Sequence, residues 1–165
     1  MDPIYIVGDG GHAQDIASYI DYVVTTIARP VEYLHHHSDL PDDHHNLFIL
    51  GMNDPNTRLN AAADIGDVGL SVHSPNLRAP QSFFMRPSDW EPEHTGYNQG
   101  AVLAPGGFRG PHVTIGRGTH VNFGTHMTRC TIGEFCTIAP GVTICGDVQI
   151  GDRVFIGAGA IIVNL

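Results

Sequence analysis

Residues 131–162, TIGEFCTIAPGVTICGDVQIGDRVFIGAGAII, decide the fold of this chain. An isoleucine returns at every sixth position, at Ile132, Ile138, Ile144, Ile150, Ile156 and Ile162. An amphipathic helix repeats at about 3.6 residues and a half-buried strand at about 2, so the period fits neither element. Six residues suit one short strand and one corner, with the aliphatic side chain in a narrow core and a small residue at the bend. Three such sides close one coil of a triangular solenoid with parallel strands.

The same period begins before this stretch. Ile115, Val121 and Met127 also follow one another at six-residue steps. The step from Met127 to Ile132 is five residues, so one residue is missing there relative to the repeat. We therefore predict a solenoid from Pro111 onward that has one shortened corner.

The first part of the chain follows another pattern. Apolar runs predict strands at 4–7, 31–34 and 47–50, and helical spacing predicts helices at 12–20 and 57–65. This order is typical of a Rossmann-like βαβ domain of the α/β class, which we assign to residues 1–70. The second domain covers residues 71–165, and its first part, 72–107, is rich in Pro, Ser and Asn and predicts an irregular connector.

A glycine-rich turn, GDGGH, lies between the first predicted strand and helix. Gly8, Gly10 and Gly11 let the backbone approach a phosphate, and the helix N-terminus adds about half a positive charge. A strand-to-helix turn without a ligand has the same composition, so both interpretations stay open. The spacing departs from the dinucleotide fingerprint, which disfavours a nicotinamide cofactor.

Composition excludes several classes of protein. The chain has 165 residues and a formal charge of −9, from 8 Lys and Arg against 17 Asp and Glu, which disfavours nucleic acid as a partner. The 3 cysteines form no CxxC pair, so we predict reduced, mostly inward-facing thiols. A basic leader and an apolar run of about 18 residues are both missing, which predicts a cytoplasmic protein without a membrane span. We interpret HHHSDLPDDHH, residues 35–45, as a solvated loop and not a metal site.

These patterns together resemble a known family. The repeat is similar to the hexapeptide, left-handed parallel β-helix transferases. The whole chain resembles sugar O- and N-acetyltransferases of the sialic-acid O-acetyltransferase and bacillosamine-pathway group. The matching stretches are YIVGDGGHAQDIASYI (5–20), LGMNDPNTR (50–58), LSVHSP (70–75) and CTIGEFCTIAPGVTICGDVQIGDRVFIGAGAII (130–162).

The resemblance implies an activity. Such enzymes move acetyl from acetyl-CoA to an amino or hydroxyl group of a nucleotide-linked sugar, as homotrimers with sites between neighbouring solenoids and without a metal. The positions implied to bind the nucleotide sugar are Gly8, Gly10, Gly11, His12, Asn53 and Arg58. The family carries acids after the second strand, where this chain has His35 and His36.

The resemblance also implies catalytic positions, and there the chain departs from the family. The family base is a His before an x-C-x-I-G run, and strict spacing puts Thr128 at that position and Thr137 at the position of a second His. His126 is the nearest substitute, either as the base or as a corner histidine at the solenoid edge. Gly146 matches the glycine whose amide faces the thioester of acetyl-CoA, and a corner glycine is the other interpretation.

Two other functions stay open. One is a zinc hydro-lyase that resembles the γ-class carbonic anhydrases, which place three His ligands across a trimer interface, with His112, His120 and His126 as candidate ligands. The other is a non-catalytic nucleotide-sugar-binding or scaffold protein, which Thr128 and Thr137 favour. The hexapeptide pattern is still in phase at Asn164 and Leu165, so we expect the β-helix to be C-terminally incomplete.

Overall fold

The structure is a computed structural model of the chain. It describes residues 4–24, 31–35, 38, 47–65, 77–78, 83–84 and 101–165. The loop at 35–45 lies outside these ranges except for His35 and Ser38, as does the predicted domain boundary at 70 and 71. None of the helices in the described ranges is both long and apolar enough to cross a membrane.

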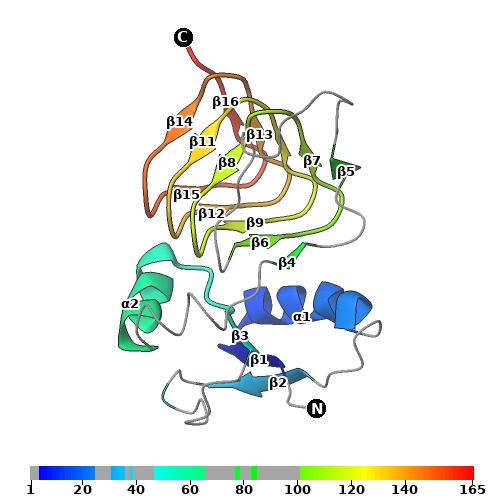
Figure 1. Cartoon of the computed structure of the whole chain (residues 1–165), viewed down its shortest axis with the longest axis vertical. Helices are drawn as coiled ribbons and strands as arrows, with labels where there is room; N and C mark the ends of the chain where they lie inside the picture. The colour runs from blue at the N-terminus through cyan, green and yellow to red at the C-terminus, as the bar shows by residue number, and fades with distance from the viewer. Residues whose placement is uncertain are drawn as a thin grey trace.

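The N-terminal part is a small parallel sheet with two helices (Figure 1). Its strands are β1 (Ile4–Val7), β2 (Val31–Leu34) and β3 (Leu47–Leu50), in the order β2-β1-β3, and its helices are α1 (Gly11–Val24) and α2 (Pro55–Ile65). All five predicted elements are present, and α1 extends beyond the predicted 12–20. Asp54 caps α2, because its carboxylate accepts a hydrogen bond from the Thr57 N–H at 2.7 Å, and Pro55 takes the first helical position.

The C-terminal part is a parallel β-solenoid with three sides. Its two-residue strands are β4 (Leu77–Arg78), β5 (Phe83–Phe84), β6 (Val102–Leu103), β7 (Phe108–Arg109), β8 (Thr114–Ile115), β9 (His120–Val121), β10 (His126–Met127), β11 (Thr131–Ile132), β12 (Thr137–Ile138), β13 (Thr143–Ile144), β14 (Gln149–Ile150), β15 (Phe155–Ile156) and β16 (Ile161–Ile162). They stack into three sheets, in the orders β16-β13-β10-β7-β5, β14-β11-β8 and β15-β12-β9-β6-β4.

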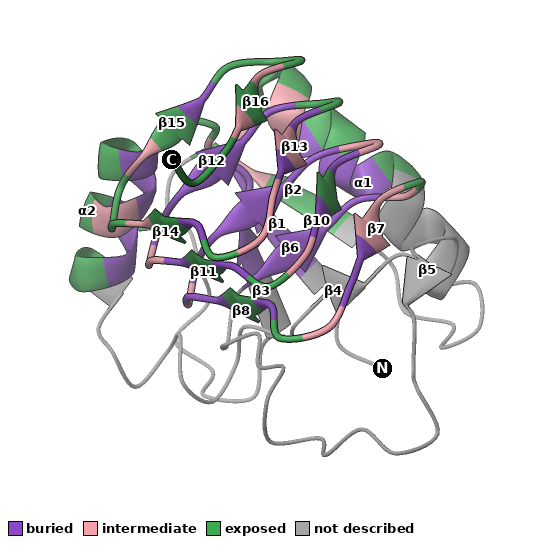
Figure 2. Ribbon diagram, turned by 90° about the horizontal axis from the view of Figure 1, so that it is seen from above, coloured by how far each residue is buried: buried purple, intermediate pink, exposed green. Residues whose placement is uncertain are grey.

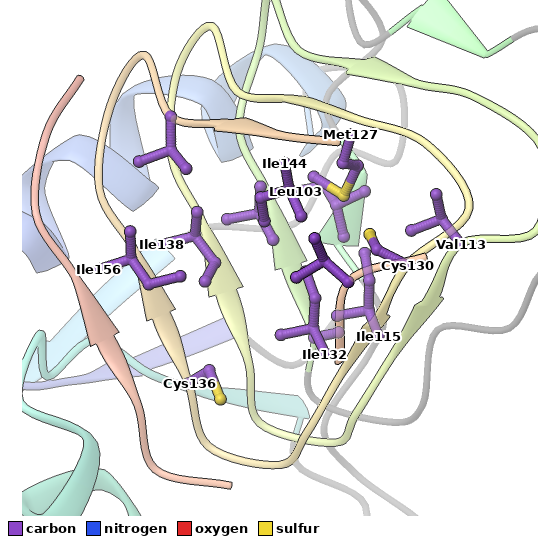
Figure 3. Close-up of a cluster of buried hydrophobic side chains, with 14 residues drawn as sticks. Leu103, Val113, Ile115, Met127, Cys130, Ile132, Cys136, Ile138, Ile144 and Ile156 are labelled. Carbon is purple, nitrogen blue, oxygen red and sulfur yellow. The ribbon is translucent and has the colours of Figure 1, made fainter. Parts of the chain in front are cut away.

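The residues of the six-step repeat form the solenoid core, as predicted. Each is the second residue of its strand and points inward, and the buried members include Ile115, Val121, Met127, Ile132, Ile138, Ile144 and Ile156 (Figure 3). Cys130 and Cys136 are buried in this core, which confirms the prediction that they face inward, and Cys145 is half-buried. Burial of these aliphatic side chains is the main force that stabilises the coils.

The prediction that 72–107 is an irregular connector is wrong for the strands that this segment contains. β4, β5 and β6 already pair as solenoid strands, so the solenoid begins well before Pro111. Leu103, Arg109 and Ile115 follow one another at six-residue steps, so the repeat extends back to Leu103. Arg109 is buried at a position of the repeat where the other coils have an aliphatic residue. A charged residue at this position hides the repeat from a search for aliphatic residues.

The shortened corner is confirmed by the strand register. Thr131 of β11 pairs with Thr114, seventeen positions earlier, and with Gln149, eighteen positions later. The corner between β10 and β11 therefore contains only residues 128–130. The strands on both sides keep their pairing, because the missing residue is removed from the corner and not from a strand.

One side of the solenoid packs against the N-terminal part. The sheet that contains β6, β9 and β12 lies next to α1 and β3, and its central residues are buried (Figures 1 and 2). Val102 and Ala104 pack with the buried side chains of Ile6, Ala13, Ile16, Ala17 and Ile49. Phe135, at a corner, packs with Tyr5, Val7, Leu50, Ala61 and Ala62. The two parts therefore share hydrophobic clusters.

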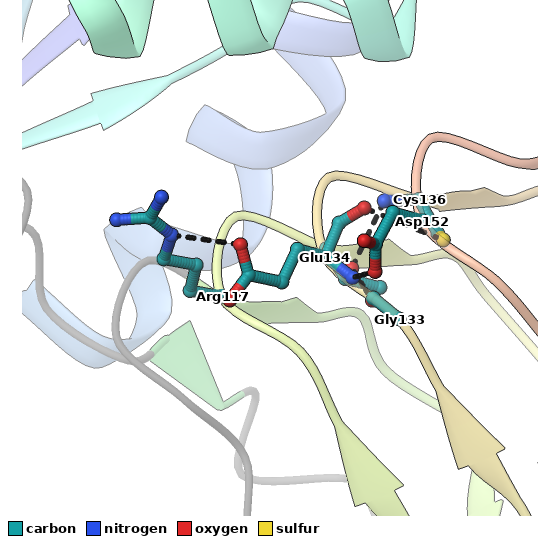
Figure 4. A network of polar contacts seen from close by, with 6 residues as sticks. Arg117, Gly133, Glu134, Cys136 and Asp152 are labelled. Carbon is teal, nitrogen blue, oxygen red and sulfur yellow. Dashed lines mark hydrogen bonds and ion pairs between the residues drawn. The ribbon is translucent and has the colours of Figure 1, made fainter.

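Polar contacts stabilise the corner that carries Phe135 (Figure 4). Arg117 Nε lies 3.0 Å from Glu134 Oε2, and the Glu134 N–H donates to Asp152 Oδ1 at 2.8 Å. The Thr119 hydroxyl donates to Gly133 O at 2.7 Å and accepts from the Cys136 N–H at 2.9 Å. These contacts join three successive coils and fix the direction of the carbonyl groups at this corner.

Candidate functional site

A cleft of about 730 Å³ lies at the carboxyl ends of β1 and β3. This is the point where the strand order of the small sheet reverses, which is the usual place for a ligand in an open parallel sheet. The cleft is lined by Gly8, Asp9, Gly10, Gly11, His12, His35, Gly51, Met52, Asn53, Thr57, Asn60, Ala61 and Asp64.

The glycine turn forms one wall of the cleft. Gly8 has a φ of 112°, a conformation that only glycine adopts at low cost. A Cβ atom on Gly10 or Gly11 would meet no other protein atom within 4 Å, so both backbones face open space. α1 begins at Gly11, which directs its first N–H groups and its positive dipole end to this region. The turn has the properties of an anion-binding site.

A close contact holds the opposite wall near the turn. A Cβ atom on Gly51 would lie 2.7 Å from the Cβ atom of Ala13, so the end of β3 approaches α1 more closely than any larger residue permits. The Gly8 N–H donates to Leu34 O at 2.7 Å and the Gly51 N–H donates to Val7 O at 2.8 Å. The glycine turn and the loop after β3 therefore keep a fixed separation.

His12 lines the cleft and also contacts the solenoid. Its Nε2 atom lies 2.7 Å from Nδ1 of His120, which starts β9 and is 1% exposed. The pKa of His12 is lowered to about 4, mainly by burial and next by the positive charge of Arg58, whereas Asp15 raises it by a smaller amount. Burial, then Arg58 and His12, hold the pKa of His120 well below its usual value. Both imidazoles are neutral at physiological pH.

Arg58 is buried and lies outside the cleft lining, although the resemblance implies a role in nucleotide-sugar binding. Its guanidinium donates hydrogen bonds across the interface, at 2.7 Å to Gly118 O and at 2.6 Å to Cys136 O. It also donates to Met52 O at 2.6 Å on its own side. Burial lowers the pKa of Arg58 to about 10, so the side chain stays charged at neutral pH. Arg58 connects the loop after β3 to the solenoid.

The other predicted nucleotide-sugar residues come together. Gly8, Gly10, Gly11, His12 and Asn53 all line the same cleft. Sequence reasoning missed Thr57, Asn60 and Asp64, which lie three and four residues apart on α2 and therefore on one helix face. That spacing was the signal that could have found them. It also missed the contact between Asp9 and His35, whose Oδ2 and Nδ1 atoms lie 2.9 Å apart.

The predicted catalytic residues lie on the solenoid. His126 is exposed at the start of β10, and Thr128 is half-buried in the shortened corner. Gly146 lies in the corner after β13, where a Cβ atom would approach the Arg129 Nη2 atom to 2.6 Å. Arg129 crosses Gly146 because it contacts Asp147 of the next coil, at 3.4 Å between Nη2 and Oδ2.

A second hollow lies at the same edge of the solenoid. It has a volume of about 330 Å³ and is lined by His112, Arg129, Cys130, Thr131, Asp147, Val148 and Gln149. Burial raises the pKa of the Cys130 thiol to about 11, so the thiol is protonated and is no nucleophile at neutral pH. His126, Thr128 and Gly146 do not contribute to this lining.

The candidate zinc ligands His112, His120 and His126 do not lie together within one chain. His120 is buried beneath the N-terminal part and bonded to His12, whereas His126 is exposed on another sheet. Among the residues that the structure describes, no three His, Cys, Asp or Glu side chains form a group that could hold a metal ion. The burial of His120 against His12 therefore speaks against His120 as a zinc ligand at a surface shared between copies.

Comparison with known sequences bears on the solenoid. Residues 129–164 match the bacterial transferase hexapeptide (six repeats). This segment is a hexapeptide repeat. The match covers the hexapeptide coils on both sides of the corner that contains Gly146. Among curated proteins, no sequence matches the chain significantly.

Solved structures with the same fold cover nearly the whole chain, the hexapeptide solenoid included. The acetyltransferase domain of PglB from Neisseria gonorrhoeae, in complex with acetyl coenzyme A, superposes with a TM-score of 0.78 at 17% identity, over 96% of this chain and 80% of that one. WeeI from Acinetobacter baumannii gives 0.80 at 18% identity, over 99% and 82%. A variant of perosamine N-acetyltransferase from Caulobacter crescentus, in complex with CoA and GDP-perosamine, gives 0.71 at 18% identity, over 98% and 89%. These likenesses establish the fold.

Proposed function

We propose that this protein transfers acetyl from acetyl-CoA to an amino or hydroxyl group of a nucleotide-linked sugar. The observation that carries the proposal is the cleft at the glycine turn, which lies directly beside a hexapeptide-repeat solenoid. Proteins with this fold include PglB in complex with acetyl coenzyme A and perosamine N-acetyltransferase in complex with CoA and GDP-perosamine. Acetyl-CoA is the co-substrate, and the reaction requires no metal.

The cleft suits the nucleotide half of such a substrate. The N–H groups at the start of α1 and the backbone of Gly10 and Gly11 would bind the diphosphate. The neutral His12 adds a hydrogen-bonding nitrogen without a charge. Asn53, Asn60 and Asp64 offer polar groups for the base, ribose or sugar hydroxyls.

The transfer needs a base and an oxyanion site. As the amine or hydroxyl attacks the thioester carbonyl, its proton moves to the base, the C–S bond breaks, and the CoA thiolate leaves and takes a proton. We assign the base to His126, which is exposed on β10 near the shortened corner, with Thr128 as a polar neighbour. The Gly146 N–H is the proposed donor to the oxyanion, at a corner where Arg129 supplies an additional positive charge.

The assembly and organisation of the protein follow from the same proposal. We propose a homotrimer, in which the solenoid edges of neighbouring copies bring His126 and Gly146 to the nucleotide sugar. The chain divides into a Rossmann-like nucleotide-sugar domain at 1–70 and a left-handed β-helix at 71–165. The proposed location is the cytoplasm, where acetyl-CoA and nucleotide sugars are available, and neither nucleic acid nor a membrane is a proposed partner.

Thiol release from acetyl-CoA tests the activity. Purified protein is incubated with acetyl-CoA and a panel of UDP-, GDP- and dTDP-linked amino sugars and hydroxy sugars, and free CoA is titrated with a thiol reagent. We expect turnover with at least one acceptor and no CoA release without it. Binding of a nucleotide sugar without CoA release on any acceptor would contradict the transferase proposal.

The shortened corner favours one second candidate, a protein that binds nucleotide sugars without catalysis. The residue missing between Met127 and Ile132 removes a position next to the proposed base, and Arg129 covers Gly146. Thr137 stands where the resemblance implies a second histidine, and it is buried beneath Arg58. The thiol-release assay separates the two candidates, because only the enzyme consumes acetyl-CoA.

A further inference from the structure

Two polar side chains of the solenoid point toward the N-terminal part and contact it. His120 and Thr137 are the first residues of β9 and β12 and lie side by side in the parallel register. Their neighbours Val121 and Ile138 point into the solenoid core, so His120 and Thr137 point to the opposite face of the sheet. Both are almost completely buried, because the N-terminal part covers this face.

Each of the two contacts a different part of the cleft lining. The Nδ1 atom of His120 lies 2.7 Å from Nε2 of His12. The hydroxyl of Thr137 donates to Asn53 O at 2.6 Å. His12 and Asn53 line the cleft, whereas His120 and Thr137 do not. We propose that His120 and Thr137 are positioning residues, which hold His12 and the Met52–Asn53 loop in the conformation that binds a nucleotide sugar.

The direction of the Thr137 hydrogen bond is fixed by a third residue. A hydroxyl has one hydrogen, and Thr137 Oγ1 accepts a hydrogen bond from Arg58 Nη2 at 3.0 Å. Its own hydrogen is therefore directed to Asn53 O. Arg58 Nη1 donates to Met52 O at 2.6 Å. The carbonyls of residues 52 and 53 thus both receive hydrogen bonds from a buried network.

The orientation of His12 is fixed in a similar way. The ring centroids of His12 and His120 are 5.0 Å apart with an angle of 35° between the rings. The contact uses the Nε2 atom of His12 and leaves Nδ1 as the nitrogen for a ligand in the cleft. A ring that is already oriented loses less conformational entropy when a ligand binds. The contact should therefore increase affinity without touching the ligand.

Hydrogen exchange tests the Thr137 contact without any ligand. Thr137→Val removes the hydroxyl at nearly constant volume, and Thr137→Ser retains it. We expect amide exchange in residues 51–54 to become about tenfold faster in Thr137→Val, to return to within about twofold of wild type in Thr137→Ser, and to stay unchanged in β11 and β13. Unchanged exchange in residues 51–54, or an equal increase along the whole solenoid, would overturn the proposal.

A binding experiment tests the His120 contact and rests on the proposed function. His120→Leu removes the nitrogen, whereas His120→Asn places an amide group near the position of Nδ1. With UDP, GDP and dTDP as probes in calorimetry, we expect Kd to rise about tenfold in the leucine variant and to recover to within about threefold of wild type in the asparagine variant. With a sugar acceptor, the KM for the nucleotide sugar should rise in the leucine variant, whereas kcat and the KM for acetyl-CoA should stay unchanged.

The two experiments separate the failure of the inference from the failure of the proposed function. Equal affinity in wild type and His120→Leu would overturn positioning by His120. If wild type binds none of UDP, GDP and dTDP, the nucleotide-sugar assignment of the cleft is wrong, and the exchange of residues 51–54 still decides whether Thr137 positions the loop.

Discussion

The imidazole rings of His12 and His120 contact each other across the junction of the two parts of the chain, with 2.7 Å between His12 Nε2 and His120 Nδ1. One ring belongs to the glycine turn of the cleft and the other to a solenoid strand. The 108 positions between them are far beyond any local pattern, so the contact links the cleft to the solenoid only in the folded chain.

Acid should weaken the fold through this pair. The pKa of both rings is lower in the folded protein than the usual value of 6.5, and that of His12 is about 4. The folded state therefore binds fewer protons, and the free energy of unfolding should fall as the pH falls from about 6.5 toward 4, by at most about 1.4 kcal/mol per pH unit for each histidine. Urea unfolding at a series of pH values measures this slope.

His12→Gln should flatten the pH slope, because it removes one of the two imidazoles whose pKa is lowered in the folded protein. An equal slope in wild type and His12→Gln would show that other groups cause the acid sensitivity.

Loss of Arg58 should destabilise the protein strongly. Arg58→Met leaves the carbonyls of Gly118, Cys136 and Met52 without their donor in a buried site. We expect a loss of about 3 kcal/mol or more in the free energy of unfolding, measured with denaturant. Arg153→Met, at an exposed corner, is the control and should change stability by less than about 0.5 kcal/mol. Similar values for the two variants would contradict the role of Arg58 as a connector.

A side chain on Gly11 should block the cleft. Gly11→Val finds open space around its Cβ atom, so the fold should remain, while its methyl groups occupy the region where the helix N-terminus meets a phosphate. Calorimetry with UDP or GDP should show a loss of binding of at least about tenfold. Gly157→Val, at an exposed corner with equally open space, should bind like wild type. Equal affinity in the two variants would remove the glycine turn from the binding site.

Removal of the proposed base should affect the chemical step. His126→Ala should lower kcat by about 10²-fold or more with little change in the KM for acetyl-CoA, because proton transfer and not binding is lost. His112→Ala, at another exposed position of the solenoid, is the control and should keep kcat within about twofold of wild type. Thiol release with the best acceptor measures both, and undiminished turnover in His126→Ala would exclude this histidine as the base.

The proposed trimer gives a prediction of its own. Sites shared between neighbouring solenoids require a stable assembly, so light scattering at micromolar concentration should give about three times the mass of the 165-residue chain. A stable monomer that still turns over acetyl-CoA would contradict shared sites.

The sequence alone determined the solenoid and the five elements of the N-terminal part. The six-residue step of Ile132 to Ile162 admits no helix and no ordinary strand, and each of these residues became the inward residue of its strand. The shortened corner could also be predicted, because the step from Met127 to Ile132 is five residues and not six. The glycine turn of the cleft was also found, since a turn between a strand and a helix is local, whereas Thr57, Asn60 and Asp64 of the same cleft were missed.

Only the tertiary structure decided what His120, Thr137 and Arg58 do. His120 and Arg58 have polar side chains, which sequence analysis assigns to the surface or to a binding site. The packing of the two parts of the chain buries both of them. Arg109 hid the coil of β6, β7 and β8, because a charged side chain interrupts the aliphatic pattern although the backbone of this coil continues the solenoid. The contacts of His120 and Arg58 across the junction join residues about 60 to 110 positions apart and depend on how the sheet of β6, β9 and β12 packs against the N-terminal part. A short-range sequence pattern cannot predict such packing, because it contains no information about distant contacts.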